Sequence, residues 1–192
     1  MKTNFLHSIS GIYAITPDRA LDLDAIEKVI VEHNIGILQY RHKTLDAKIQ
    51  LNEATQLQRL CTKHHTLFII NDDSNLAQKI HADGVHLGKN DGSIQQARKQ
   101  LGADTIIGVS CYDDIDLAKK AQQQGADYVA FGALFSSSTK PNTIHCPLSI
   151  VQEAKQNLTI PIVGIGGIDF NNQQSAVDAG CDAVAMINAL WD

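Results

Sequence analysis

Two aspartates follow neighbouring apolar segments near the middle of the chain. Asp72 comes shortly after the run Leu67–Ile70, and Asp91 comes shortly after the run Gly84–Leu87. Two carboxylates at neighbouring strand ends can share one hard cation such as Mg²⁺ and leave positions open for a substrate phosphate. An aspartate at such a junction is also a common helix cap or turn residue. The pair therefore indicates either a metal site or two local structural roles.

Basic and amide side chains alternate at the end of an earlier apolar run. If Gln39 points into a barrel, Arg41 and Lys43 share that side, whereas Tyr40 and His42 do not. Arginine offers a fork for phosphate oxygens and lysine a point charge, so this side suits an anionic ligand. The alternative is that Arg41 and Lys43 are solvated residues of a surface loop.

Two later segments could hold phosphate groups. The hydroxyl-rich run Ser136–Pro141, which includes Lys140, could wrap a phosphate and stabilise charge as a bond breaks, or it could be a flexible loop. The run Ile165–Ile168 carries two adjacent glycines and is expected to open a helix. Together with Ile187–Asn188 it matches the place where barrels often bind phosphate on backbone N–H groups. The glycine pair could also serve only a tight turn.

These residues fall at the ends of regularly alternating elements. Short apolar runs predict strands at Ile12–Ile15, Ile35–Tyr40, Leu67–Ile70, Gly84–Leu87, Thr105–Val109, Asp127–Phe131, Ile160–Gly164 and Asp182–Ile187. Segments of helical spacing follow, at 23–33, 45–65, 73–80, 94–101, 113–124, 147–157 and 169–179. Strand–helix units repeated without a linker predict a single-domain (β/α)₈ TIM barrel over residues 1–192, in which the candidate side chains share one mouth. An open doubly wound sheet is the alternative, but its glycine fingerprint is absent after the first strand.

Composition excludes several classes of protein. The 192 residues are 44% hydrophobic and 19% charged, enough for a sizeable core, and the net charge of −5 argues against nucleic-acid binding. No apolar run is long enough to span a bilayer, and the first residues lack the apolar core of a signal peptide. We therefore expect a cytoplasmic protein that acts on small molecules, with its state as monomer or homo-oligomer open.

Cysteines and histidines do not form a metal-binding pattern. Cys61, Cys111, Cys146 and Cys181 lie far apart, so we expect free thiols in a reducing compartment. The pairs His64–His65 and His81/His86 lack the spacing of a zinc site and are expected to be surface or packing residues.

Several of these motifs together resemble the thiamine phosphate synthase family. The resemblance rests on QYRHK (39–43), IINDD (69–73), ADGVHLGKND (82–91), IGVS (107–110), SSSTK (136–140) and IGGI (165–168), and it covers about Ile12 to Leu190. It implies a single-domain (β/α)₈ barrel. The implied reaction joins a hydroxymethylpyrimidine diphosphate to a thiazole phosphate with Mg²⁺, giving thiamine phosphate and pyrophosphate.

The resemblance also implies roles for individual residues. Asp72 and Asp91 would be the Mg²⁺ ligands, and Lys140, Arg41, Lys43 and Ser110 the catalytic residues. Pyrimidine diphosphate would be held by Gln39, Arg41, Lys43 and Asn71, and Ser110 would contact the pyrimidine. Thiazole phosphate would be held by Ser137, Thr139 and the backbone at Gly167 and Ile187–Asn188. The complete set of expected substrate-binding residues is Gln39, Tyr40, Arg41, His42, Lys43, Asn71, Ser110, Ser137, Ser138, Thr139, Lys140, Gly167, Ile187 and Asn188.

Three positions depart from the family pattern, and two rival functions remain. The family usually has Glu where this chain has His42, Gln where it has Lys89 and Ser where it has Asn188. Of the three, only Asn188 is near the expected phosphate site. One rival is the related thiazole tautomerase, which is metal-free and relies on a histidine where this chain has Tyr112. The other rival is a non-catalytic barrel that binds a thiamine precursor and regulates a partner. Turnover with both substrates and Mg²⁺ would separate the three functions.

The role expected for Lys140 gives a first prediction. If the bond from pyrimidine to diphosphate breaks first, negative charge grows on the leaving group, and Lys140 would neutralise part of it. Lys140→Ala should lower the single-turnover rate by about 10²–10³ while weakening thiazole phosphate binding far less. An electron-withdrawing substituent on the pyrimidine should also slow this step. A rate that stayed unchanged or rose with that substituent would contradict this mechanism.

Overall fold

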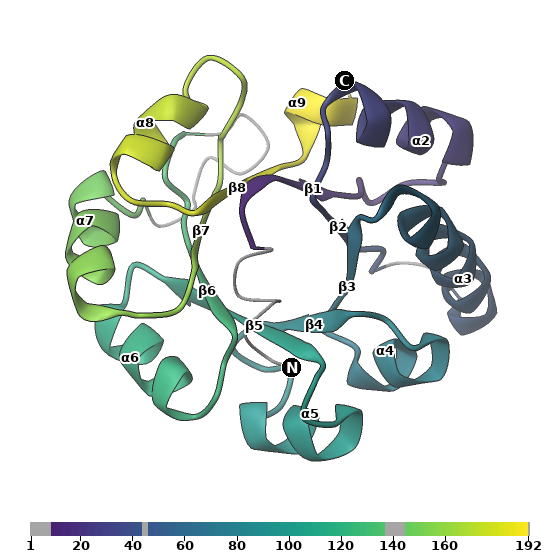
Figure 1. Cartoon of the computed structure of the whole chain (residues 1–192), viewed down its shortest axis with the longest axis horizontal. Coiled ribbons are helices and arrows are strands. Elements are labelled where there is room, and N and C mark those ends of the chain that lie inside the picture. Colours follow the sequence, from purple (N-terminus) through teal and green to yellow (C-terminus); the bar gives the residue numbers. More distant parts are fainter. Residues whose placement is uncertain (1–8, 44–45, 137–144, 192) are drawn as a thin grey trace.

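The chain folds as a closed barrel of parallel strands in the order β1 to β8 (Figure 1). The structure is a computed structural model that describes residues 9–43, 46–136 and 145–191. Each strand pairs in parallel with the next, and β8 closes the ring on β1. The strands are β1 (Gly11–Ile15), β2 (Ile37–Tyr40), β3 (Leu67–Asn71), β4 (Gly84–Leu87), β5 (Ile106–Tyr112), β6 (Tyr128–Phe131), β7 (Ile162–Ile165) and β8 (Ala183–Met186).

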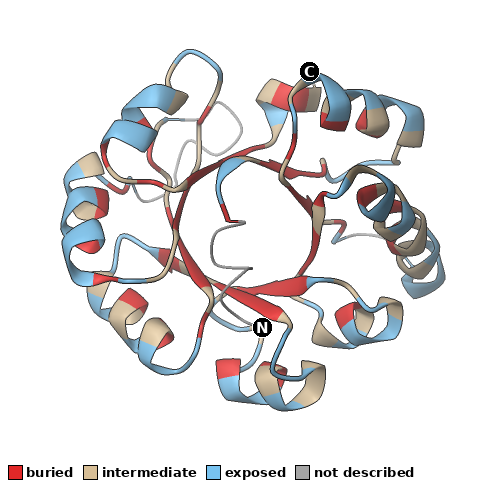
Figure 2. Ribbon diagram, viewed as in Figure 1, coloured by how far each residue is buried: buried red, intermediate tan, exposed pale blue. Residues whose placement is uncertain are grey.

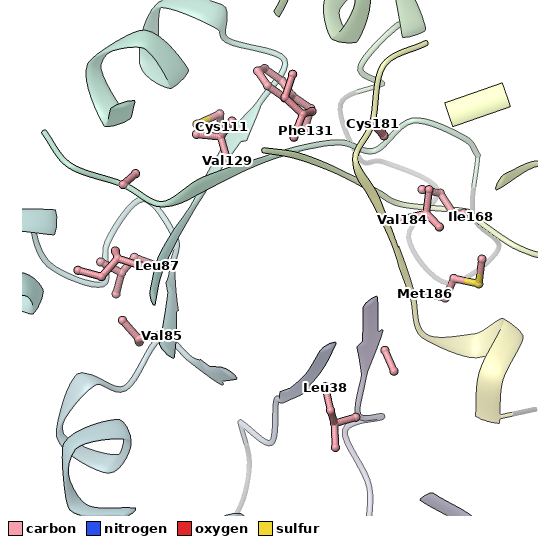
Figure 3. Packing of buried hydrophobic residues seen from close by; sticks show 14 of the residues in the cluster. Leu38, Val85, Leu87, Cys111, Val129, Phe131, Ile168, Cys181, Val184 and Met186 are labelled. Carbon is pink, nitrogen blue, oxygen red and sulfur yellow. The ribbon is translucent and has the colours of Figure 1, made fainter. Parts of the chain in front are cut away.

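Helices surround the ring and bury its outer side (Figure 1). They are α2 (Leu23–Glu32), α3 (Ala47–His64), α4 (Ser74–Ile80), α5 (Ile94–Leu101), α6 (Ile115–Gln123), α7 (Leu148–Asn157), α8 (Gln173–Asp178) and α9 (Asn188–Trp191). Figure 2 shows a continuous ring of buried strands, and helices that are exposed only on their outer faces. Outward-facing residues such as Leu38, Phe68 and Val129 pack against apolar helix positions such as Leu57, and Figure 3 shows part of this layer. The predicted (β/α)₈ barrel is confirmed.

A second apolar cluster fills the inside of the barrel. Apart from Ile9, its fully buried members all come from strands, and they alternate with the outward-facing residues as the strand period requires. Tyr13 and Tyr128 are the largest of them, and their rings meet edge to face with centroids 6.1 Å apart. Gly108 on β5 makes room for this pair, because a Cβ there would lie 2.0 Å from Cζ of Tyr128. The barrel interior is therefore a packed layer that supports the mouth from below.

Most predicted elements match the structure to within a residue or two, and two differ by more. The strand expected to end at Val109 continues to Tyr112 as β5. The helix expected from Asp169 begins only at Gln173. Before it, the Asp169 carboxylate accepts N–H groups of Asn171 and Asn172, which forms a local turn that delays the helix. The short helix α9 after β8 was not predicted. The four cysteines are buried and unpaired, which agrees with the expected free thiols. In the described part of the chain, no helix has the length and apolar character needed to cross a membrane.

An aspartate before three of the even-numbered strands joins neighbouring strands at the opposite end from the mouth. Asp83, Asp127 and Asp182 each accept the backbone N–H of a residue at the start of the preceding strand, at 2.8–2.9 Å. Asp127 also pairs with Arg98 of α5, and Asp182 with Lys155 of α7. Because these contacts tie strand to strand and helix to strand far from the mouth, we assign them to stability.

This assignment predicts that Asp127→Ala destabilises the barrel. The change leaves the N–H of Ile107 without its acceptor and removes the carboxylate partner of Arg98, so the free energy of unfolding should fall by about 1–3 kcal/mol. Urea unfolding of the variant and of the exposed control Asp116→Ala measures this. Asp116→Ala should stay within about 0.5 kcal/mol of the parent protein. Equal losses in the two variants would contradict the assignment.

Candidate active site

Asp72 and Asp73 have different roles after β3. The Asp73 carboxylate accepts the N–H groups of Asn75 and Leu76 and so caps α4. Asp72 adopts a left-handed backbone conformation (φ 65°), and its N–H donates to the carbonyl of His86 at 2.8 Å. Because the cap is supplied by Asp73, the Asp72 carboxylate does not serve as the helix cap and is available at the mouth.

Asp91 approaches Asp72 over Gly88, the first residue after β4. The N–H of Gly88 donates to Oδ2 of Asp91 at 2.9 Å, and α5 is capped separately by Ser93. A Cβ added at Gly88 would lie 2.7 Å from Oδ2 of Asp91 and 3.9 Å from Oδ1 of Asp72. The two carboxylates therefore converge on one small space that only glycine leaves open.

The two carboxyl groups influence each other's protonation. Burial would raise the pKa of Asp72, but hydrogen bonds with Lys43 and Asp91 outweigh it and hold this pKa below its usual value. Burial and the contact with Asp72 raise the pKa of Asp91. The opposite directions are expected when two carboxylates share a site, because each resists the ionisation of the other. A bound cation would relieve this repulsion.

Lys43 borders the carboxylates, and Arg41 lies two residues before it, directly after the end of β2. The Nζ atom of Lys43 lies 2.9 Å from Oδ2 of Asp72. Arg41 lies 3.6 Å from Asp18, whose other oxygen accepts the N–H of Lys43 at 3.0 Å. The buried Thr16 hydroxyl accepts the N–H of Arg41 at 2.9 Å. Asp18 and Thr16 therefore fix the basic segment, a role that their place in a Thr-Pro-Asp turn did not reveal.

The side chains of Tyr40 and His42 lie on the other side of β2. The Tyr40 hydroxyl donates to Glu53 of α3 at 2.8 Å, and Nδ1 of His42 lies 2.9 Å from the same carboxylate oxygen. This follows from the strand alternation that turns Gln39 inward. The structure therefore removes these two side chains from the set that faces the mouth.

A chain of buried polar groups runs across the barrel below the mouth. Nε2 of Gln39 donates to the Tyr13 hydroxyl at 2.9 Å, and the hydroxyls of Tyr13 and Tyr128 lie 2.8 Å apart. The Tyr128 hydroxyl lies 2.9 Å from Nδ1 of His86, and Nε2 of His86 lies 2.8 Å from Oγ of Ser110. Ser110 is thus the member of the chain nearest the mouth, next to the bulge at the end of β5.

His86 was expected to be a surface or packing residue, and the structure places it inside the barrel. Burial lowers its pKa to about 4, so the imidazole is neutral at pH 7. Its ring stacks on Tyr128 with centroids 5.5 Å apart. Neither Tyr13 nor Tyr128 stood out in the sequence, because residues 115 positions apart become partners only when the barrel closes. The alternating position of His86 on β4 was the one available signal.

The glycine turn after β7 meets the start of the loop after β6. The N–H of Phe135 donates to the carbonyl of Gly166 at 3.0 Å, and a Cβ at Gly167 would lie 2.6 Å from the carbonyl oxygens of Phe135 and Ser136. Both glycines have positive φ, at 95° and 63°. The glycine pair is therefore required by a close backbone approach, and it does not directly open α8 as expected.

The remaining predicted site residues have the following positions. Asn71 ends β3 beside His86, and Ile187 and Asn188 join β8 to α9. Ser137, Ser138, Thr139 and Lys140 lie outside the described residues, so their predicted roles stay predictions. Among the residues that the structure describes, no cluster of three or more His, Cys, Asp or Glu side chains could enclose a metal ion. Asp72 and Asp91 would supply only part of a cation's ligands.

Comparison with known proteins identifies relatives of nearly the whole chain. The Thiamine monophosphate synthase family matches residues 12–190. A thiamine-phosphate synthase of Chromobacterium violaceum is 50% identical over 186 residues, which cover 96% of this chain and 89% of that protein. A thiamine-phosphate synthase of Methylobacillus flagellatus is 47% identical over 193 residues, which cover 100% of this chain and 92% of the relative.

A solved structure is similar along nearly the whole chain. Thiamine phosphate pyrophosphorylase from Pyrococcus furiosus superposes with a TM-score of 0.86 at 28% identity, covering 97% of this chain and 89% of that one. The sequence relatives, the family match and this shared barrel lead to the same assignment. The chain belongs to the thiamine monophosphate synthase family of transferases.

Proposed function

We propose that this protein joins an aminopyrimidine diphosphate to a thiazole phosphate, forming thiamine phosphate and releasing pyrophosphate. The observation that carries the proposal is the convergence of Asp72 and Asp91 beside Lys43 at the mouth of the barrel. Carboxylates suited to a hard cation, next to basic groups suited to phosphate, are what a leaving diphosphate requires. We also propose that the protein is cytoplasmic and acts alone or as a homo-oligomer.

Mg²⁺ fits the donors that the site offers. Asp72 and Asp91 would hold the ion, since both present hard oxygen atoms to one space and their mutual repulsion favours a cation between them. With two protein carboxylates, the other ligands would be diphosphate oxygens and water. When bound, Mg²⁺ would neutralise negative charge on the diphosphate.

The basic residues would bind and orient the diphosphate. Lys43 pairs with Asp72 at 2.9 Å, so its ammonium already lies at the carboxylate pair and can turn to a phosphate oxygen. The Thr16 hydroxyl accepts the backbone N–H of Arg41. This contact fixes the point at the mouth from which the Arg41 side chain extends. Both charges would stabilise the pyrophosphate as it departs, with the help predicted for Lys140.

A dissociative reaction needs no general base, and the described buried side chains below the mouth supply none. In this reaction the C–O bond to the diphosphate breaks, and the electron pair of that bond leaves with pyrophosphate. The thiazole nitrogen then supplies the electron pair of the new C–N bond to the pyrimidine cation. That nitrogen carries no proton, so no general base is required. His86 is the buried imidazole nearest the reaction, and both of its nitrogens already contact Tyr128 and Ser110. It is therefore not placed to act as a base.

The thiazole phosphate would bind on the far side of the mouth. The turn Gly166–Gly167 and the start of α9 after Ile187 both lie at carboxyl ends of strands, where barrels commonly hold phosphate. The described start of the loop after β6 is joined to that turn, because the N–H of Phe135 donates to the carbonyl of Gly166. This location supports the predicted roles of Gly167, Ile187 and Asn188 in binding.

Three aspartate variants test the proposal. Asp72→Asn and Asp91→Asn should each lower kcat/KM by orders of magnitude, because either change removes a cation ligand, with little change in unfolding free energy. Asp73→Asn is a matched control, since the Asp73 carboxylate caps α4 and Asn caps a helix about as well as Asp. Steady-state rates at several Mg²⁺ concentrations measure these effects.

Two results would contradict the metal assignment. One is full activity of the parent protein in excess chelator. The other is a loss in Asp73→Asn that equals the loss in Asp72→Asn, since the effect would then come from the β3–α4 junction and not from the carboxylate pair.

A further inference from the structure

The buried polar chain below the mouth has a direction that proton counting can determine. Its hydrogen bonds join Gln39, Tyr13, Tyr128, His86 and Ser110, which come from five different strands. Each phenol has one proton to give, a neutral imidazole has one N–H, and the Nε2 side of a primary amide only donates. The first four side chains are nearly inaccessible to solvent, with exposures of 0–8%. Bulk water therefore cannot replace one of these side chains as the hydrogen-bond partner of another.

The direction follows from the Gln39 end. Tyr13 accepts from Nε2 of Gln39, so its own proton is free to donate to Tyr128 at 2.8 Å. Tyr128 then donates to Nδ1 of His86 at 2.9 Å. In the opposite direction, Tyr13 would accept from both neighbours, and its proton would have no acceptor among the contacts of the described residues. The first direction gives the proton of each phenol an acceptor.

This direction fixes the tautomer of His86 and the role of Ser110. If Nδ1 accepts from Tyr128, the imidazole proton is on Nε2 and donates to Oγ of Ser110 at 2.8 Å. The Ser110 hydroxyl, already an acceptor from below, then has its proton left for a ligand in the mouth. This proton makes Ser110 a hydrogen-bond donor to an acceptor group on the ligand.

We propose that Gln39, Tyr13, Tyr128 and His86 act as positioning residues that make Ser110 a hydrogen-bond donor, selecting a substrate ring with an unprotonated nitrogen at that point. The substrate part of this inference rests on the proposed function, in which the ring is an aminopyrimidine. An analogue that carries an N–H at that position would lose the hydrogen bond from Ser110 and should bind more weakly. The tautomer part rests on the structure alone.

The first test measures the tautomer of His86 without any substrate. In the ¹⁵N-labelled full-length protein at pH 8, long-range ¹H–¹⁵N correlation spectra should show Nε2 protonated and Nδ1 unprotonated. The His86 signals are identified by their loss in His86→Gln or, if that variant does not fold, by their shift in Ser110→Ala. A proton on Nδ1, or a doubly protonated ring, would overturn the proposal even if the protein is active.

A pair of tyrosine variants tests the cause of the tautomer. Tyr128→Phe removes the proton donor to Nδ1, so the two His86 nitrogens should lose their distinct signals and become averaged between tautomers. Tyr40→Phe is the matched control, because its hydroxyl donates to Glu53 on the other side of the barrel wall. It should leave the His86 signals unchanged. An unchanged tautomer in Tyr128→Phe, or a changed one in Tyr40→Phe, would refute the assigned direction.

A double-mutant cycle tests whether the chain acts through Ser110. Tyr128→Phe should raise KM for the pyrimidine diphosphate about tenfold, as expected for one weakened hydrogen bond, and leave KM for the thiazole phosphate nearly unchanged. In a Ser110→Ala background the same change should have little further effect. Additive effects would show that Tyr128 does not act through Ser110. If the protein turns over neither substrate, the proposed function fails, while the tautomer measurement still decides this proposal.

Discussion

The repulsion between the carboxylates of Asp72 and Asp91 is the constraint on which the mouth of this barrel depends. The two groups converge over Gly88. Burial and the contact with Asp72 raise the pKa of Asp91, whereas hydrogen bonds with Lys43 and Asp91 outweigh burial and lower the pKa of Asp72. Lys43 offsets part of that charge from the neighbouring strand. In the proposed function, a cation bound at this site would offset the remaining negative charge, so that a diphosphate could approach it.

Residues other than Asp72 and Asp91 cap the helices that begin beside this carboxylate pair. Asp73 caps α4 and Ser93 caps α5, so neither Asp72 nor Asp91 is needed for helix ends. At the opposite end of the barrel, Asp127 and its equivalents tie the strands together. Contacts assigned to stability thus lie at one end and the candidate functional groups at the other, which is the usual division in this architecture.

Much of the architecture could be predicted from the sequence, because local pattern determines it. The bounds of β4 and α5 were predicted to the residue, and the alternation that turns Gln39 inward and Tyr40 outward is confirmed. Strand ends are local, so Asp72 and Asp91 could be placed at the mouth. The choice between Asp72 and Asp73 as the helix cap could not be made, since it depends on backbone angles. The partners of His86 come from distant strands that meet only on closure, so periodicity alone did not reveal them.

Titration of the two carboxyl groups tests the central claim most directly. In protein labelled with ¹³C at aspartate side chains, the carboxyl shifts of Asp72 and Asp91 can be followed against pH with and without Mg²⁺. Without the ion, Asp91 should titrate above the usual range of an aspartate and Asp72 below it. Saturating Mg²⁺ should lower the pKa of Asp91 strongly, because the cation favours both ionised forms. Titration curves that Mg²⁺ leaves unchanged would contradict the account.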